Sequence, residues 1–218
     1  MRLAIFSDIH SNGIAFETCL DYADHVGIDG YVFLGDLLTD CPYPRRTLDL
    51  VRIAARKKQV WCVRGNREER LIKHNDHPSE VWRSQGTTGS MLYTYEQMTA
   101  QDIDFIRRMP LTDVIEIPGC PLIRIAHASP TDTAAMLFPG NEPLERILRN
   151  MKESLFLTGH SHFQYRYESR GKQVVNPGSV GMPSFGQKKA QFALITCEAG
   201  RWTARLMNID YDKDKEIA

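Results

Sequence analysis

Three short apolar segments near the start of the chain alternate with two segments of helical character. The apolar segments span residues 2–8, 31–36 and 59–63, and helix-forming sequence lies between them at residues 12–25 and 45–57. Continuous apolar character fits strands that are buried on both faces of a sheet. Strands that alternate with helices in this way predict an α/β fold with parallel βαβ units, whose ligands bind beyond the carboxyl ends of the strands.

The second half of the chain contains a different pattern. Residues 113–117 and 122–126 predict two strands joined by a turn, a short helix follows near residues 143–151, and another apolar strand begins at residue 155. Four further segments, separated by glycine-containing turns, have strand character: residues 164–168, 172–175, 191–196 and 201–208. Apolar and polar residues alternate in part of these segments, so we expect a second, largely antiparallel sheet.

The segment from residue 69 to residue 110 interrupts this alternation. It has no clean strand pattern, and its clearest element is a predicted helix at residues 100–108. A chain of 218 residues is long enough for one sizeable core and short for two ordinary domains. We therefore expect residues 1–218 to form a single domain in which residues 69–110 are an insertion that covers a site.

Several residues of this middle segment resemble functional groups. Trp82, Tyr93 and Tyr95 are predicted to form a small core of their own, and stacking on a nucleobase is the alternative. His74 and His77 have a spacing that metal ligands use, but their neighbours are polar. We therefore predict a solvated loop around these two histidines.

Charge and cysteine content limit the classes of partner and compartment. Lysine plus arginine and aspartate plus glutamate both number 27, so the protein exerts no long-range attraction on nucleic acid or on an acidic membrane. The five cysteines are scattered and never have Cys-x-x-Cys spacing, which argues against a disulfide framework and a zinc ribbon. Strand-like sequence from Arg2 leaves no room for a signal peptide, and no apolar run approaches the roughly 20 residues of a membrane helix. These features predict a cytoplasmic protein.

Five predicted strand ends carry side chains that bind metals. They are Asp8 with His10, Asp36, Asn66, His127, and His160 with His162. If the first strand continues to His10, its alternation places Asp8 and His10 on the same face. Any one of these residues could be structural, but that explanation must then hold at five separate strand ends. Three carboxylate or amide oxygens and four imidazoles suit two borderline metals better than one, with Asp36 as a candidate bridge.

Gly35, Gly65 and Gly159 directly precede three of these residues, where the missing Cβ permits close approach.

The order of these residues resembles the calcineurin-like metallophosphoesterase superfamily over nearly the whole chain. The segments that carry the resemblance are Asp8-x-His10, Gly35-Asp36, Gly65-Asn66, His127 and Gly159-His160-Ser161-His162. The chain is also similar to the small prokaryotic branch of phosphodiesterases and diadenosine tetraphosphatase relatives, through Ser11-Asn12, Met109-Pro110-Leu111 and Asn176-Pro177-Gly178-Ser179-Val180-Gly181. The resemblance implies a four-layer α-β-β-α sandwich of two mixed sheets flanked by helices.

The resemblance also implies a ligand set and an activity. One metal would be held by Asp8, His10, Asp36 and His162, and the other by Asp36, Asn66, His127 and His160. Mixed nitrogen and oxygen ligands fit two divalent transition metals, with manganese expected first and iron, zinc, cobalt or nickel as alternatives. Two such ions, about 3.5 to 4 Å apart, would bind phosphoryl oxygens and hold a bridging hydroxide for hydrolysis. The candidate catalytic residues are Asn66, Arg67 and His127.

Arg67 departs from the family pattern, which commonly has a histidine after the asparagine. An arginine forks well onto phosphate oxygens but cannot donate a proton to a leaving alkoxide at neutral pH. We therefore expect a small phosphorylated or nucleotide substrate, a phosphodiester or a nucleotide polyphosphate. The alternative for Arg67 is a surface side chain paired with Glu68 or Glu69.

Two other functions share this fold. A non-catalytic scaffold, as in the retromer-subunit relatives of the superfamily, does not need all seven ligands, and none is missing here. A protein serine/threonine phosphatase shares the metal site but usually has a longer chain. The sequence leaves the oligomeric state open.

Overall fold

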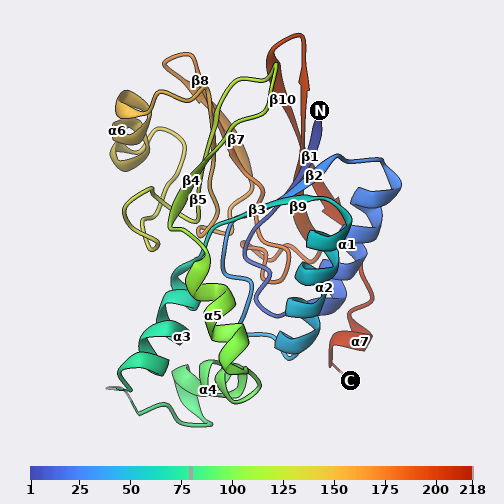
Figure 1. Cartoon of the computed structure of the whole chain (residues 1–218), viewed down its shortest axis with the longest axis vertical. Coiled ribbons are helices and arrows are strands. Elements are labelled where there is room, and N and C mark those ends of the chain that lie inside the picture. Colours follow the sequence, from blue (N-terminus) through green and yellow to red (C-terminus); the bar gives the residue numbers. More distant parts are fainter. Residues whose placement is uncertain (79–80, 218) are drawn as a thin grey trace.

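Two five-stranded sheets pack face to face at the centre of the protein (Figure 1). The computed structural model describes residues 1–78 and 81–217. From edge to edge, the first sheet contains β10 (Arg201–Ile209), β9 (Ala190–Glu198), β1 (Arg2–Phe6), β2 (Gly30–Phe33) and β3 (Gln59–Cys62). The second contains β4 (Thr112–Ile115), β5 (Ile123–Ala126), β6 (Leu155–Leu157), β8 (Lys172–Asn176) and β7 (Tyr165–Ser169).

Both sheets are mixed, as the fold prediction requires. Strands β1, β2 and β3 are parallel, and β9 and β10 add to them as antiparallel strands. Strands β5, β6 and β8 are parallel, and β4 and β7 are antiparallel edges. The expectation of a separate, largely antiparallel C-terminal sheet was wrong. Local alternation identified these strands, but pairing is decided by contacts across the sheet, and the last two strands join β1.

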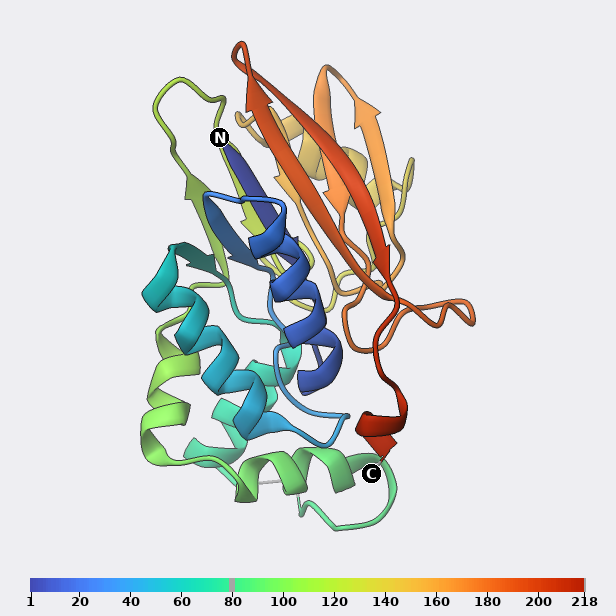
Figure 2. The same cartoon turned by 90° about the vertical axis from the view of Figure 1, so that its right-hand side faces the viewer.

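Helices cover the outer faces of both sheets (Figure 2). Helices α1 (Gly13–His25) and α2 (Pro44–Lys57) cover the first sheet, where Phe6, Phe16 and Phe33 are fully buried. Helix α6 (Glu142–Asn150) covers the second sheet and packs Leu144 and Leu148 around Phe156. Between the sheets lies an aliphatic core rich in isoleucine, leucine and valine. The α-β-β-α sandwich is therefore confirmed.

The middle segment is helical and lies beyond one end of the sheets (Figure 1). It contains α3 (Asn66–Asp76), a 3₁₀ turn (Gly86–Thr88), α4 (Gly89–Glu96) and α5 (Ala100–Arg108), and a short α7 (Asp214–Ile217) follows β10 near the end of the chain. The predicted helix at residues 100–108 is confirmed, whereas α3 was not predicted. Its sequence is strongly polar, so it lacks the apolar periodicity by which a helix is recognised.

The aromatic residues of this segment form a small core, as predicted for two of the three. Trp82 is buried, its ring stacks on His74 with centroids 3.7 Å apart, and Tyr95 packs against both rings edge-on. Tyr93 is instead exposed and donates a hydrogen bond to the Pro42 carbonyl. The solvated-loop prediction was wrong for His74, which lies in the last turn of α3 and packs on Trp82.

Two further sequence expectations concern covalent and membrane features. Among the described residues, no cysteine takes part in a disulfide bond. The described helices include none that combines the length and the apolar character needed to cross a membrane.

Candidate metal centre

The predicted ligands lie in loops at one edge of the two sheets, beyond the carboxyl ends of the parallel strands. Asp8 and His10 follow β1, Asp36 follows β2, Asn66 begins α3 after β3, His127 follows β5, and His160 and His162 follow β6. Parallel strands end at the same edge of a sheet, so face-to-face packing brings loops from both sheets together. The structure therefore brings all seven predicted ligands into one region.

Left-handed backbone, rather than strand alternation, places most of these ligands. Strand β1 ends at Phe6, and Asp8 and His10 have φ angles of 53° and 49°, so the prediction that a continuous strand aligns them was wrong. Asp36, His160 and His162 also have positive φ. This conformation costs an L-residue about 1 to 3 kcal/mol and persists where the surroundings enforce it, most often at functional sites.

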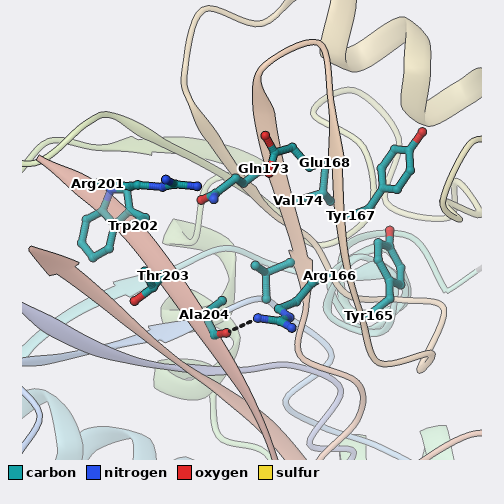
Figure 3. Close-up of a pocket in the computed structure, with 11 residues that line it drawn as sticks. Tyr165, Arg166, Tyr167, Glu168, Gln173, Val174, Arg201, Trp202, Thr203 and Ala204 are labelled. Carbon is teal, nitrogen blue, oxygen red and sulfur yellow. Dashed lines mark hydrogen bonds between the residues drawn. The ribbon is translucent and has the colours of Figure 1, made fainter.

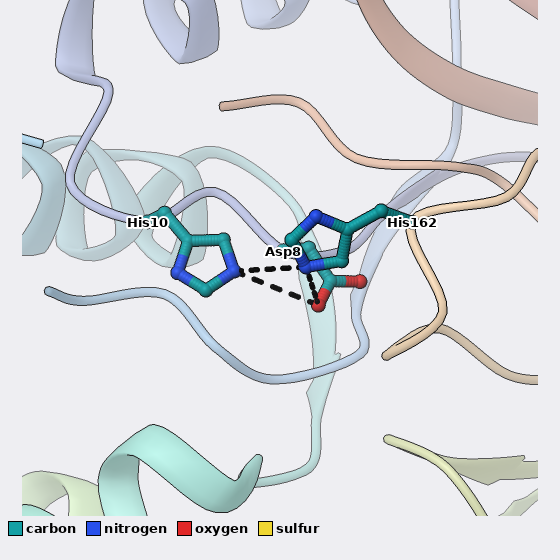
Figure 4. Close-up of side chains that lie close together, drawn as sticks. All are labelled: Asp8, His10 and His162. Atoms are coloured by element: carbon teal, nitrogen blue, oxygen red, sulfur yellow. Dashed lines mark hydrogen bonds and ion pairs between the residues drawn. The ribbon is translucent and has the colours of Figure 1, made fainter. Parts of the chain in front are cut away.

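Asp8, His10 and His162 form a first ligand group (Figure 4). The Nε2 atoms of His10 and His162 are 3.1 Å apart, and each faces the carboxylate of Asp8. Asp8 Oδ1 lies 3.2 Å from His162 Nε2 and 3.8 Å from His10 Nε2. The three potential donor atoms all lie within 4.8 Å of one another.

Asp36, His127 and His160 form a second ligand group, next to the first. Asp36 Oδ2 lies 3.5 Å from His127 Nε2 and 3.9 Å from His10 Nε2 of the first group. Asn66 Oδ1 lies 3.1 Å from His127 Nε2, which adds an amide oxygen to the second group. The Asp36 carboxylate therefore lies between the two groups.

These donor atoms fit metal ions. Ligands bonded to one cation at about 2.0 to 2.2 Å must lie roughly 3 to 4 Å apart, which matches the distances within the first group and those from His127 to Asp36 and Asn66 in the second. Asp8 Oδ1 is buried and accepts no well-formed hydrogen bond from the described residues, although imidazole nitrogens of His10, His127 and His162 lie within 4.0 Å of it. A cation shared by Asp8 Oδ1 and these imidazole nitrogens would satisfy this acceptor.

The electrostatics of the site also favour positive charge. Burial raises the pKa of Asp8, but the close contact with His162 and the charge of His127 outweigh it and hold this pKa well below its usual range. Burial lowers the pKa of His127, whereas the carboxylates of Asp36 and Asp8 raise it, to about 10 in total. Buried carboxylates must be compensated by positive charge. Divalent cations bound by these residues would supply that charge in place of protons on the histidines.

Each of three histidines has an acceptor at its second ring nitrogen. His127 Nδ1 donates to the Leu34 carbonyl at 2.7 Å, and His162 Nδ1 donates to the Met182 carbonyl at 2.6 Å. His10 Nδ1 lies 2.9 Å from a carboxylate oxygen of Asp40. A carbonyl can only accept, so the contacts of His127 and His162 fix the proton on Nδ1 and leave Nε2 free to bind a metal.

Glu68 supports the loop that carries Asp36, and the sequence analysis missed it. Glu68 is fully buried, and its carboxylate accepts hydrogen bonds from the backbone N–H groups of Asp36, Leu37 and Gly65 at 2.8 to 2.9 Å. Burial and the neighbouring charge of Asp36 raise the pKa of Glu68. An acid three residues after a helix cap is a recognisable signal, but only once α3 itself is identified.

The Asn176–Gly181 segment forms hydrogen bonds with the loops that carry the predicted ligands. Ser179 Oγ donates to the Asp8 carbonyl at 2.7 Å, and Asn176 Nδ2 donates to the Gly159 carbonyl at 2.8 Å. A Cβ on Gly159 would lie 1.9 Å from Ser7 Oγ, and one on Gly65 would lie 2.1 Å from Asp36 Oδ1. The prediction that these glycines allow close approach is confirmed.

Arg67 lies beside the ligands and pairs with Asp40, not with Glu68 or Glu69. Its Nη2 lies 3.2 Å from Asp40, and its backbone N–H donates to Asp36 Oδ1 at 2.8 Å. The Nε atom of Arg67 is buried and has no hydrogen-bond partner among the described residues. Asp40, which the sequence analysis also missed, thus contacts both His10 and Arg67, and the charge of these partners keeps its pKa low against the effect of burial.

A separate pocket of about 650 Å³ opens between β7, β8 and β10 (Figure 3). The apolar side chains of Val175 and Ala204 contribute to it, and Arg166 crosses it to donate a hydrogen bond to the Ala204 carbonyl. None of the seven predicted ligands lines this pocket. It is an opening of the core between the sheets, apart from the ligand groups.

The sequence matches a protein family and an individual protein. The profile of the calcineurin-like phosphoesterase superfamily domain matches residues 1–200. An uncharacterized protein of Methanocaldococcus jannaschii is 24% identical over 230 residues, which cover 98% of this chain and 89% of that protein.

Two solved structures have a similar fold. A hypothetical protein of Pyrococcus horikoshii superposes with a TM-score of 0.87 at 22% identity, covering 99% of this chain and 90% of the other. A metallophosphoesterase of Sphaerobacter thermophilus superposes with a TM-score of 0.78, also at 22% identity, covering 99% and 91%. At this level of identity the structures show a shared fold.

Proposed function

Because this chain belongs to the calcineurin-like phosphoesterase superfamily, we propose that it is a dinuclear metal-dependent phosphoesterase. The position of Asp36 carries the proposal, since its Oδ2 atom lies 3.5 Å from His127 Nε2 and 3.9 Å from His10 Nε2. A carboxylate in that position can bridge two cations. One cation would be held by Asp8, His10, Asp36 and His162, and the other by Asp36, Asn66, His127 and His160.

The proposed substrates are phosphodiesters or nucleotide polyphosphates. Bound divalent cations polarise phosphoryl oxygens and lower the pKa of a coordinated water. Arg67 offers a buried N–H donor without a partner among the described residues, which suits a phosphate oxygen. Because arginine gives up no proton at neutral pH, the leaving group must depart without protonation by this residue. Good leaving groups, such as aryl oxides or phosphates, are therefore favoured.

Manganese is the proposed metal, chosen from the divalent transition metals that accept mixed nitrogen and oxygen ligands. We also propose a single cytoplasmic domain in which α3, α4 and α5 cover the site. Ser90 on α4 supports this covering role, because its hydroxyl donates to Asp40 at 3.1 Å and Asp40 contacts His10.

Metal analysis combined with a substrate panel tests the proposal. Elemental analysis after manganese loading should give two metal ions per chain, and a chelator should abolish hydrolysis until manganese is restored. Phosphodiesters and dinucleoside polyphosphates should be hydrolysed faster than alkyl phosphomonoesters. A protein that binds no metal after incubation with manganese and hydrolyses none of these compounds would instead be a scaffold.

A further inference from the structure

A second pocket directly adjoins the metal centre and shares His162 with it. It has a volume of about 380 Å³ and is lined by side chains from the loop after β6, the loop between β8 and β9, and the strands β9 and β10. Small-molecule sites typically measure about 300 to 1,000 Å³, so this pocket suits one compact group. A phosphoester bound at the metal centre must place its organic group nearby, and this pocket is contiguous with the ligands.

Two exposed phenyl rings form one wall of this pocket. Phe163 follows the ligand His162 directly, and Phe185 lies in the loop between β8 and β9, which projects beside the ends of the strands (Figure 2). The side chain of Phe185 is 79% exposed, and its ring meets Phe163 edge-on with centroids 5.5 Å apart. Exposed rings cost free energy in water. A flat aromatic ligand that covers them recovers that cost.

The backbone holds Phe185 in position and couples it to the metal centre. Phe185 has a φ of 58°, a left-handed conformation that is unfavourable for a bulky side chain. Ser184 donates a hydrogen bond to the Ser161 carbonyl at 3.2 Å, and the Met182 carbonyl accepts from His162 at 2.6 Å. The loop that presents Phe185 therefore also orients a metal ligand.

The floor of the pocket is polar and carries no unpaired charge. Asn208 links two glutamines: it donates to Gln164 Oε1 at 3.0 Å and accepts from Gln191 Nε2 at 3.1 Å. Lys189 is paired with Asp210 at 2.7 Å. A phosphate chain would find no uncompensated lysine or arginine among the residues that line this pocket. The surroundings favour a flat, uncharged group with hydrogen-bonding edges.

Trp82 and Tyr95 of the helical middle segment do not offer such a surface, and Tyr93, which is exposed, does not line this pocket. Trp82 is only 7% exposed and is already stacked on His74. Tyr95 packs edge-on against both rings and donates to Asn75. The rings open to a ligand beside the metal centre are therefore those of Phe163 and Phe185.

We propose that this pocket holds the nucleobase of a nucleotide substrate, stacked on Phe185 and Phe163. This proposal rests on the phosphoesterase function and specifies its substrate class. The phosphate lies at the metal centre and the base lies beyond His162. Recognition by stacking tolerates different bases, because every base has an aromatic face.

Two esters with the same leaving group test the pocket. They are thymidine 5′-(p-nitrophenyl phosphate) and methyl p-nitrophenyl phosphate, so the ratio of their kcat/KM values isolates the nucleoside. Removing an aromatic platform costs about 5- to 100-fold per stacked base. Phe185→Ala and Phe163→Ala should each lower the ratio by about 10-fold, whereas Phe185→Trp should retain it. Ile53→Ala, which truncates an exposed apolar side chain on α2, is the matched control and should retain the wild-type ratio.

A binding measurement that needs neither metal nor turnover separates this proposal from the proposed function. Saturation-transfer NMR of thymidine with metal-free protein should show transfer to the base protons in the wild type and in Ile53→Ala, and little in Phe185→Ala. If both esters are hydrolysed and the ratio is unchanged in both alanine variants, the pocket assignment is overturned and the phosphoesterase stands. If neither ester is hydrolysed by the manganese-loaded wild type, the phosphoesterase proposal fails, and the thymidine signals alone decide the pocket.

Discussion

The two ligand groups of the metal centre differ in how they are supported. In the first group, Asp8 and His10 are buried, whereas the side chain of His162 is 21% exposed and is oriented by the carbonyl of Met182, in the loop between β8 and β9. The second group also has one half-buried member, His160, but its His127 is fully buried and is oriented by the carbonyl of Leu34 in the core. A ligand held by the core is fixed when the protein folds. A ligand held by an exposed loop can move with that loop.

This difference predicts unequal metal sites. We expect the cation of the first group to exchange faster with solvent, because one of its ligands, His162, is oriented by an exposed loop. The second cation should be retained longer on dilution or mild chelation. Substitution of Asp36, which lies between the two groups, should weaken the binding of both cations.

The largest effect is expected for Asp36→Asn, which tests whether the groups are joined. An amide cannot bridge two cations as a carboxylate can, so both metals should bind more weakly. We expect kcat/KM to fall roughly 1,000-fold or more, since metal catalysis supplies several kcal/mol of the barrier reduction. Elemental analysis would check the metal content. Loss of one metal with full retention of the other would show that Asp36 belongs to one group only.

The next effect separates the two groups from each other. His162→Ala and His127→Ala should each lower activity by roughly 100-fold or more, but through different cations. Only His127→Ala should also destabilise the metal-free fold, by about 1 to 3 kcal/mol, because the buried Leu34 carbonyl loses its donor.

Cobalt spectra of the loaded variants and urea unfolding of the metal-free variants measure these two properties. His25→Ala, at the exposed end of α1, is the matched control. Removal of the same ion by both substitutions would contradict the assignment of the groups.

A smaller effect is expected for Arg67, whose backbone N–H contacts Asp36 and whose side chain is proposed to bind the phosphate of the substrate. A charge-assisted hydrogen bond contributes about 1.5 to 3 kcal/mol, so Arg67→Ala should lower kcat/KM about 10- to 100-fold with metals retained. Arg67→Lys should recover little, because lysine lacks the fork.

Leaving-group dependence gives a second test of Arg67. The wild type should slow steeply as the leaving group becomes more basic, and Arg67→His should flatten that dependence by adding a general acid. Arg108→Ala, an exposed arginine on α5, serves as the control. An Arg67→Ala protein with metals intact and wild-type rates on a bis-aryl phosphate would remove this residue from the active site.

The smallest effects concern the two supporting acids. Asp40→Asn weakens the partner of His10, so it should lower the affinity of the first cation about 10-fold and leave the second unchanged. Glu68→Gln replaces one acceptor oxygen by a donor amide, which should destabilise the fold by about 1 to 3 kcal/mol through the Asp36 loop. Metal titration and urea unfolding distinguish these outcomes. If both substitutions lowered the affinity of both cations equally, Asp40 would not be specific to the first ligand group.

Much of the fold and the list of candidate ligands followed from local sequence patterns. The βαβ alternation and α5 were predicted correctly, because apolar periodicity and turn residues act over a few positions, whereas the two mixed sheets followed from the family resemblance. Helix α3 was missed because its polar sequence carries little periodicity. With it, the role of Glu68 was missed too, since a buried carboxylate that accepts backbone hydrogen bonds resembles any surface acid in the sequence.

The sequence by itself determined which residue types stand at the ends of the strands, and through them the chemistry of the site. Only the tertiary structure decided how these residues meet: Asp8 and His10 by left-handed backbone, Asp36 between two groups, and Asp40 against His10. It also placed Phe185 beside His162, although 22 positions separate them along the chain. The physical reason is that residue type and short-range periodicity are written locally, whereas distances between loops depend on how the two sheets pack.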